Sequence, residues 1–399
     1  MTVAPALGNP FEDARSKKEA VAAFAGAEDL LVKKDANGLR GLYESWKTNY
    51  NIEYPDTEDA QRFHNFVASV RRIIGNNRDA CTAHWSGLNA LSALSDAEFK
   101  ARFTTTLQRQ DTPAATTAER PPRRALLQSK LPAYKNWVAE GKVTKVKNQG
   151  GCGGCWAFAG ISAMESRVLI ALNQTNTTNA IDLSEQQVVD CARATPSFPY
   201  SFGCGGGQLE DPYRYAALGF SAPEALYPYV AKTNTCRIVN ATAARVKLSG
   251  TGFTALPINS ATVFKTALQT SPLSIAFYAS DRTFRDYKAS QPGRPALAAC
   301  TTPPCGNPWM VDHAVLLVGY NATESSWYIK NSWGATWGEK GFFRMFMKPD
   351  GTQGTCQMYT WGVQPTAPAY PAPLARPAGV LTMLDRSGGG PSGTQPRRG

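Results

Sequence analysis

Apolar residues recur every three or four positions in the first hundred residues, which predicts amphipathic helices. Leu42, Trp46 and Tyr50 lie at i, i+4 and i+8, and residues 58–77 repeat this spacing. Ser95 is followed three positions later by a glutamate, a capping-box pattern that predicts a further helix start. The front of the chain is therefore expected to be helical.

The pattern changes in the main body of the chain. Residues 156–172 keep helical spacing, but later apolar runs are short, rich in β-branched and aromatic residues, and bounded by Gly, Pro, Asn or Asp. These runs are PLSIAFYA, HAVLLVGY, SWYIKNSW and GFFRMFM. We expect a helical subdomain followed by a sheet subdomain, with a cleft between them where a ligand binds.

Low-complexity segments separate these parts. One is rich in Thr, Pro and Arg and is typical of an exposed linker, and the end of the chain is rich in Pro, Gly and Ala. We therefore divide the chain into five segments: a leader that we expect to be partly disordered (1–38), a helical domain (39–105), a linker (106–130), a main body (131–364) and a disordered tail (365–399).

Composition adds limits on function. The 399 residues are 43% hydrophobic and 18% charged, an ordinary globular balance. The net charge of +11 is spread along the chain without a long Lys/Arg block, so we expect no nucleic-acid partner. No apolar run approaches the roughly 18 residues of a membrane helix, so no membrane span is expected.

Cysteines and glycosylation motifs point to an oxidising compartment. Eight of the nine cysteines lie at or after Cys152. Four Asn-x-Ser/Thr motifs begin at Asn173, Asn176, Asn240 and Asn321. We expect the secretory pathway, in a lysosome-like or vacuole-like compartment or outside the cell, although the chain shows no apolar secretion signal. The alternative is a cytosolic protein with reduced thiols.

The stretch QGGCGGCWAF carries the first candidate chemistry. Cys155 opens the predicted helix, where the helix dipole favours a thiolate, and the glycines before it permit a tight turn and close approach of a substrate. Cys152 lies three positions earlier. The pair is compatible with a redox couple, half of a zinc site, or two thiols with separate roles.

Three further residues complete a possible site. His313 is the one histidine of the main body and could serve as base for a thiol nucleophile. Asn331 lies between strand-like residues and two tryptophans, Trp333 and Trp337, and could orient an imidazole shielded from water. Gln149 could donate its side-chain amide to an oxyanion.

Together, QGGCGGCWAF, VDHAV and KNSWGATWG resemble the motifs of papain-like, cathepsin-type cysteine proteases. The resemblance implies an α+β fold with two subdomains, a helical left half and an antiparallel, β-barrel-like right half, preceded by a small helical propeptide domain. It also implies a peptidase without cofactor or metal. Gly154 stands where the family motif has Ser or Ala.

The resemblance assigns a role to each matching position. Cys155 corresponds to the nucleophile, paired as thiolate with a His313 imidazolium, and His313 acts as base and then as acid. Asn331 orients His313, and Gln149 completes the oxyanion hole. The implied reaction is attack on a peptide carbonyl, formation of a thioester, and hydrolysis.

Disulfide pairings also follow from the resemblance. Cys152 would then be structural rather than redox-active. The implied pairs are Cys152 with Cys204, Cys191 with Cys236, and Cys305 with Cys356. Cys81 and Cys300 are left over, and Cys300 could compete for Cys356.

The resemblance places the substrate cleft as well. Gly206 and Gly207 match the strand that pairs with an extended substrate, and Trp333 shields the site. The second specificity pocket would be lined by Leu209, Ala276, Ala314 and Trp361. None of these is acidic, so we expect apolar or aromatic side chains there, not arginine. We expect an endopeptidase that acts as a monomer on peptides and proteins, with cystatin-like inhibitors as candidate partners.

The front of the chain resembles a papain-type propeptide over residues 39–105. The motif positions are Glu58, Arg62, Phe66, Ile73 and Asn77, with Ser69 as a departure. The resemblance implies a zymogen in which this domain covers the cleft. Acid would weaken the contacts between the domain and the enzyme, and the chain would be cut within residues 106–130. In the following segment Leu91 and Ala93 replace the family's Phe and Asp.

Other functions remain open on the sequence alone. One is a catalytically silent homologue that only binds. Another is a thiol oxidoreductase that uses Cys152 and Cys155. A zinc site lacks a second ligand pair at metal-binding spacing. A peptide ligase on the same scaffold is a further alternative.

Overall fold

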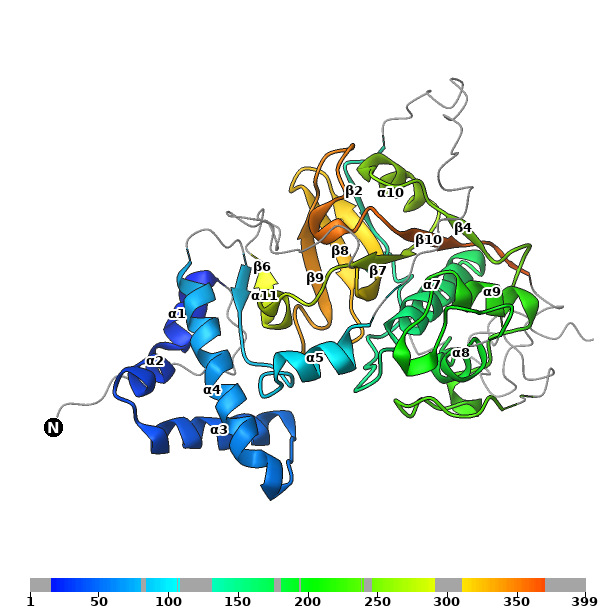
Figure 1. Cartoon of the computed structure of the whole chain (residues 1–399). Coiled ribbons are helices and arrows are strands. Elements are labelled where there is room, and N and C mark those ends of the chain that lie inside the picture. The colour runs from blue at the N-terminus through cyan, green and yellow to red at the C-terminus, as the bar shows by residue number, and fades with distance from the viewer. Residues whose placement is uncertain are drawn as a thin grey trace, which may run out of the picture. The chain divides into compact units, whose positions relative to one another are not determined.

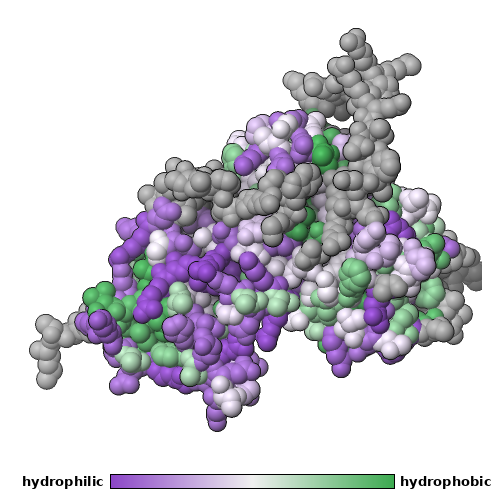
Figure 2. All heavy atoms as spheres, in the orientation of Figure 1, coloured by the Kyte–Doolittle hydropathy of each residue, from purple (hydrophilic) through white to green (hydrophobic). Residues whose placement is uncertain are grey.

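A computed structural model describes residues 16–79, 84–105, 107, 131–175, 181–193, 195–237, 239, 246–290 and 311–369. Residues 365–369, which the sequence analysis assigned to the disordered tail, are ordered, because Pro368 and Ala369 pair with Leu248 and Lys247 in a short sheet. The rest of the predicted tail lies outside the described residues, as does the predicted linker apart from Leu107. Within the described residues, no helix is long and apolar enough to cross a membrane. On the face shown in Figure 2, hydrophilic and hydrophobic side chains are interspersed.

The front region, residues 16–105, is helical as expected. Its elements are α1 (Lys17–Ala23), α2 (Ala25–Val32), α3 (Ala36–Tyr50), α4 (Asp56–Arg78), strand β1 (His84–Ser86) and α5 (Asp96–Phe103) (Figure 1). The capping box at Ser95 and Glu98 is present. Within the leader, expected to be partly disordered, residues 17–32 form α1 and α2, because Ser16 caps α1 and Phe24 is buried in the front core.

The front core is built on aromatic side chains of α3 and α4. Tyr43, Trp46 and Phe66 are fully buried and contact one another. The buried guanidinium of Arg62 pairs with Glu58 at 2.7 Å and with Glu98 at 2.6 Å, which joins α4 to α5. The motif residues Glu58, Arg62 and Phe66 therefore stabilise the front region from within.

The first half of the main body is helical. It contains α7 (Cys155–Ala171), α8 (Glu185–Cys191), η2 (Gly203–Gly205), α9 (Asp211–Leu218) and η3 (Glu224–Leu226). Nearly every residue of α7 is buried, because it packs between α8, α9 and strands β5 and β7 of the sheet. The helix is therefore buried on nearly every side, and its buried Glu165 is paired with Lys147.

The second half forms an antiparallel sheet. Its strands are β2 (Tyr134–Asn136), β4 (Phe253–Ala255), β5 (Leu273–Phe277), β7 (His313–Asn321), β8 (Ser326–Lys330), β9 (Phe342–Phe346) and β10 (Gly362–Pro365). Their order is β4-β10-β5-β7-β8-β9, with β2 also pairing with β7 (Figure 1). The four apolar runs of the sequence became β5, β7, β8 and β9.

Shorter elements complete the described main body. They are β3 (Lys247–Leu248), α10 (Ala261–Ala267), α11 (Arg282–Arg285), β6 (Tyr287–Ser290), η5 (Thr355–Gln357) and β11 (Pro368–Ala369). Strand β11 pairs with β3, and β6 pairs with β1 of the front region. The front region thus contributes a strand to the main body.

The front region also shares the core of the main body. Leu91, Leu94, Phe99, Phe103 and Leu107 belong to the same apolar cluster as α7 and the sheet. Burial of apolar area is the main favourable term in such contacts. The part of the front region that contains α5 therefore packs into the core of the main body as an element of the main body itself would.

Candidate active site

Cys155 is the first residue of α7, and Gly154 is the N-cap. Its side chain is completely buried, and it is the one free cysteine among the described residues. A Cβ at Gly154 would lie 3.3 Å from the sulfur of Cys152 and 3.5 Å from the hydroxyl of Tyr229, which is tight but does not exclude a small side chain. Glycine at this departure from the family motif therefore gives the turn more room.

His313 begins β7 and is joined to Asn331, which follows β8. The distance from His313 Nε2 to Asn331 Oδ1 is 2.8 Å. The other ring nitrogen, Nδ1, is buried and has no hydrogen-bond partner among the described residues. The indole of Trp333 lies 4.8 Å from the imidazole between ring centroids, and Trp337 packs behind it at 5.0 Å. Asn331 and Trp333 thus fix the ring while one nitrogen stays available.

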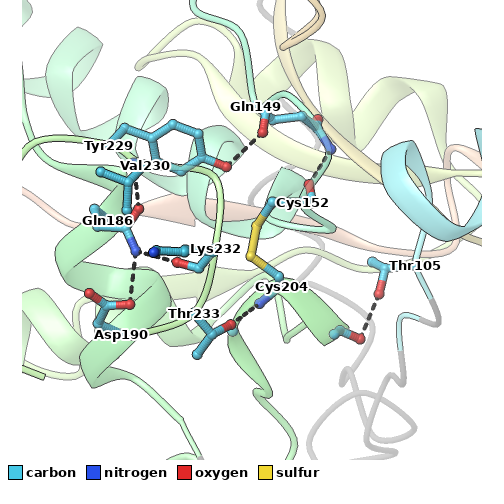
Figure 3. The surroundings of a disulfide bond; sticks show 12 residues. Thr105, Gln149, Cys152, Gln186, Asp190, Cys204, Tyr229, Val230, Lys232 and Thr233 are labelled. Carbon is cyan, nitrogen blue, oxygen red and sulfur yellow. Dashed lines mark hydrogen bonds between the residues drawn. A yellow bond between two sulfur atoms is a disulfide. The ribbon is translucent and has the colours of Figure 1, made fainter. Parts of the chain in front are cut away.

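Gln149 is held from several sides. Its Oε1 accepts from the hydroxyl of Ser332 at 2.6 Å. Its carbonyl accepts from the hydroxyl of Tyr229 at 2.8 Å (Figure 3). Its amide Nε2 donates to the carbonyl of Cys152 at 2.9 Å and, at 3.5 Å, to that of Phe103 from the front region. The carbonyl of Phe103 in the front region therefore contacts Gln149 Nε2, the amide that the sequence analysis assigned to the oxyanion hole.

Burial sets the protonation state of this closed form. It raises the pKa of the Cys155 thiol to about 12 and lowers the pKa of His313 to about 4. Both groups are neutral at physiological pH in this environment. The expected thiolate–imidazolium pair is therefore not favoured while the front region is docked. Phe99 and Phe103 of that region contact the indole of Trp333 edge-to-face.

The end of the front region contacts both subdomains of the main body. The backbone N–H of Thr105 donates to the carbonyl of Asp312 at 2.8 Å. Its hydroxyl donates to the carbonyl of Gly205 at 2.8 Å (Figure 3). Gly206 has φ +110°, and a Cβ there would lie 2.1 Å from the Thr105 hydroxyl. Only glycine permits this approach.

The four predicted pocket residues are all buried. Ala276 of β5 pairs with Ala314 of β7, and the N–H of Ala276 donates to the carbonyl of Trp361 at 3.1 Å. Leu209 belongs to the same apolar cluster, as does Leu107 of the front region, which is 5% exposed. Leu107 and these residues are thus parts of one continuous apolar core.

Two of the three implied disulfides join pairs of described residues. Cys152 is bonded to Cys204 (Figure 3). Cys191 is bonded to Cys236. Cys356 is also disulfide-bonded, but Cys305, Cys300 and Cys81 lie outside the described residues. Since Cys152 is bonded to Cys204, it cannot form a redox pair with Cys155 in this state.

A buried charge cluster lies behind the site. Lys147 contacts Glu165 at 3.1 Å, Asp182 at 2.8 Å and Glu185 at 2.8 Å. Burial lowers the pKa of Lys147, but the three carboxylates outweigh it and hold that pKa well above its usual value. Lys330, directly before Asn331, reaches Ser162 of α7 at 3.3 Å. These contacts join the helical half to the sheet beneath the site.

No cluster of three His, Cys, Asp or Glu residues able to hold a metal ion occurs within the described parts of the chain. The chemistry available at the site is that of a thiol, an imidazole and amide donors. Such a set supports nucleophilic catalysis with a general base.

Comparison with known families agrees with this geometry. Residues 131–366 match the model of the papain family cysteine protease, peptidase C1, which is more than half of the chain. The chain belongs to the papain family of cysteine proteases. Residues 43–99 match the cathepsin propeptide inhibitor domain, I29. The recognised family and the papain-like α+β fold are therefore confirmed, and the chain is a papain-type cysteine peptidase with a propeptide.

Relatives in this family include plant enzymes. Chymopapain of Carica papaya is 34% identical over 328 residues, covering 80% of this chain and 84% of the relative. Cysteine proteinase EP-B 1 of Hordeum vulgare is 32% identical over 351 residues, covering 85% and 87%. A solved procathepsin L2 from Tenebrio molitor larval midgut is 27% identical with a TM-score of 0.68, covering 82% of this chain and 99% of that one.

Some residues of this papain-family site were not found from the sequence. Ser332 holds Gln149, and Glu210 accepts from the indole Nε1 of Trp361 at 2.9 Å. Ser332 lies inside the KNSWG motif and could have been suspected from its position. Nothing in the sequence signals Glu210, since its contact joins positions 151 residues apart.

Proposed function

We propose that this papain-family endopeptidase cleaves peptide bonds through a thioester on Cys155. The 2.8 Å contact between His313 Nε2 and Asn331 Oδ1 carries the proposal, because it leaves Nδ1 available for the thiol. In the open enzyme, water returns to the site and the desolvation that keeps both groups neutral is reduced. The proton of Cys155 then moves to His313 Nδ1.

The sulfur attacks the carbonyl carbon of the substrate, and the electron pair moves onto the carbonyl oxygen. Gln149 Nε2 and the backbone N–H of Cys155 stabilise that oxyanion. When the carbonyl re-forms, the peptide C–N bond breaks and His313 gives its proton to the leaving amine. Water, deprotonated by His313, then attacks the thioester and releases the acid and the free thiol.

We propose that residues 39–105 keep the enzyme inactive until the chain is cut within 106–130. Thr105 and Phe103 occupy backbone partners that an extended substrate would need, and Leu107 is buried with the pocket residues. The same contacts support an apolar preference in the second specificity pocket. Trp361, fixed by Glu210, would shorten that pocket.

The setting of the enzyme is also a proposal. The two disulfides support an oxidising compartment, and we propose the secretory pathway with a lysosome-like, vacuolar or extracellular destination. Peptides and proteins are the substrates, the propeptide is the intramolecular inhibitor, and cystatin-like proteins are candidate inhibitors of the monomer.

Labelling with a covalent epoxide inhibitor of papain-type enzymes tests the catalytic roles. Processed protein should be labelled at Cys155 and cleave peptide substrates, whereas Cys155→Ser should do neither. A processed wild-type enzyme that is neither labelled nor active would show a silent homologue. Profiling substrates at the second position before the cut tests the pocket, and a strong arginine preference would contradict it.

A further inference from the structure

Strand β1 is the element through which the front region extends the fold of the peptidase. It pairs antiparallel with β6, with His84 opposite Ser290 and Ser86 opposite Tyr287. The N–H of Gly87 continues the contact by donating to the carbonyl of Asp286 at 2.9 Å. Separation of β1 from β6 is therefore part of any release of the front region.

The imidazole of His84 is buried in this contact. It is 5% exposed, and both ring nitrogens are buried without a hydrogen-bond partner among the described residues. Its ring lies 5.7 Å from that of Tyr287 between centroids. A neutral imidazole tolerates such an apolar contact, but a charged one would lose its hydration without compensation.

The surrounding groups do not offer a counter-ion contact. From α1, Lys17 adds a positive charge, and its ammonium donates to the carbonyl of Asp79 at the end of α4. The negative charge of the Asp79 carboxylate has the opposite effect and raises the pKa of His84. From β6, the Tyr287 hydroxyl donates to Glu339, and the stem of Lys288 packs against Gly87. Burial, followed by Lys17, lowers the pKa of His84 to about 4.

We propose that His84 is an acid-sensing residue of the zymogen, whose protonation separates β1 from β6 and releases the front region. The proposal rests on the inhibitory role of residues 39–105 proposed above. The imidazole supplies a titratable group inside the contact between β1 and β6.

The direction of the effect follows from the two pKa values. The ring titrates at about 4 when docked and near its ordinary value of about 6.5 when released. The docked state therefore binds fewer protons, so its contact is intact above about pH 6.5 and is lost as pH falls towards 4. Between pH 7 and pH 5 release should become about 20-fold more favourable.

The full-length chain with His84→Phe tests this inference, because phenylalanine keeps an aromatic ring against Tyr287 but cannot be protonated. His64→Phe is the matched control, since His64 lies exposed on α4 of the same region. The activation rate is measured from pH 7 to pH 4 and divided by the mature enzyme's activity at each pH. His84→Phe should activate about 20-fold more slowly than wild type at pH 5. Identical pH profiles for wild type and His84→Phe would overturn the inference.

A second measurement covers the case in which His84→Phe does not fold. The chain has three histidines, so inactive His313→Ala retains only His64 and His84. A histidine ring titration by NMR should show one ring with a pKa at least one unit below the other. Two ordinary values would overturn the inference. Full peptidase activity of the uncut wild-type chain would instead refute the proposed inhibition itself, and the inference with it.

Discussion

The ion pair between Arg72 and Asp286 joins the propeptide helix α4 to the peptidase. Two nitrogens of the guanidinium donate to the two carboxylate oxygens: Arg72 Nε donates to Asp286 Oδ2, and Arg72 Nη2 donates to Asp286 Oδ1 at 3.1 Å. The side chain of Asp286 is 0% exposed and that of Arg72 is 17% exposed. Removal of the arginine therefore leaves a buried carboxylate without its main cation.

The expected cost follows from that burial. Loss of one partner of a buried pair costs about 3 to 5 kcal/mol, and partial exposure of Arg72 favours the lower end. Arg285 Nε lies 3.8 Å from Asp286 Oδ1 and gives partial compensation. A loss of about 3 kcal/mol corresponds to about 100-fold weaker docking of the propeptide.

The assay uses full-length Arg72→Met, which keeps the apolar stem of the side chain. At pH 7, the initial rate at which a covalent epoxide inhibitor labels Cys155 in the uncut zymogen reports the open fraction. That rate should rise about 100-fold. Arg71→Met is the matched control, because Arg71 is the exposed neighbour on the same helix. A labelling rate for Arg72→Met within twofold of this control would refute the reasoning.

Three further outcomes are expected. Ser332→Ala removes the donor to Gln149 Oε1 and should lower kcat of the mature enzyme about 10-fold in steady-state kinetics, whereas a change in KM alone would contradict an orienting role. Because burial raises the pKa of Cys155 to about 12, iodoacetamide at pH 8 should alkylate the zymogen at least about 100-fold more slowly than the mature enzyme, as followed by mass spectrometry; equal rates would contradict this burial. Joint replacement of Cys152 and Cys204 by serine opens a bridge across 52 residues and should lower the free energy of unfolding by about 4 kcal/mol in guanidinium denaturation, while an unchanged value would contradict the loop-closure argument.

Much of the fold was predictable because long elements carry strong periodicity. The helices α3 and α4 and the strands β5, β7, β8 and β9 lie where the apolar spacing placed them. Strand β1 was not predicted, since three residues carry no period and its partner β6 lies about 200 positions later. Such pairings depend on the folded arrangement of distant segments.

The site divides in the same way. Cys155, His313 and Asn331 could be found because each lies in a local motif, and their assigned roles remain predictions. The neutral state of Cys155 in the closed form could not be foreseen, because it depends on burial in a core to which Phe99 and Phe103 of the propeptide also belong. The hydrogen bonds between Ser332 and Gln149 and between Trp361 and Glu210 join residues far apart in the sequence, so no local pattern predicts them.

Strand β6 has one consequence for the life of the enzyme after activation. Among the described residues, its only strand partner is β1 of the propeptide. Once the propeptide leaves, the backbone groups of Tyr287–Ser290 that faced β1 form an open edge, which can template pairing with another chain. Strand β1 therefore has two protective roles in the newly made protein: it helps to hold the inhibitory propeptide in place, and it covers a strand edge that could lead to aggregation. The mature enzyme loses both when the propeptide is cut off.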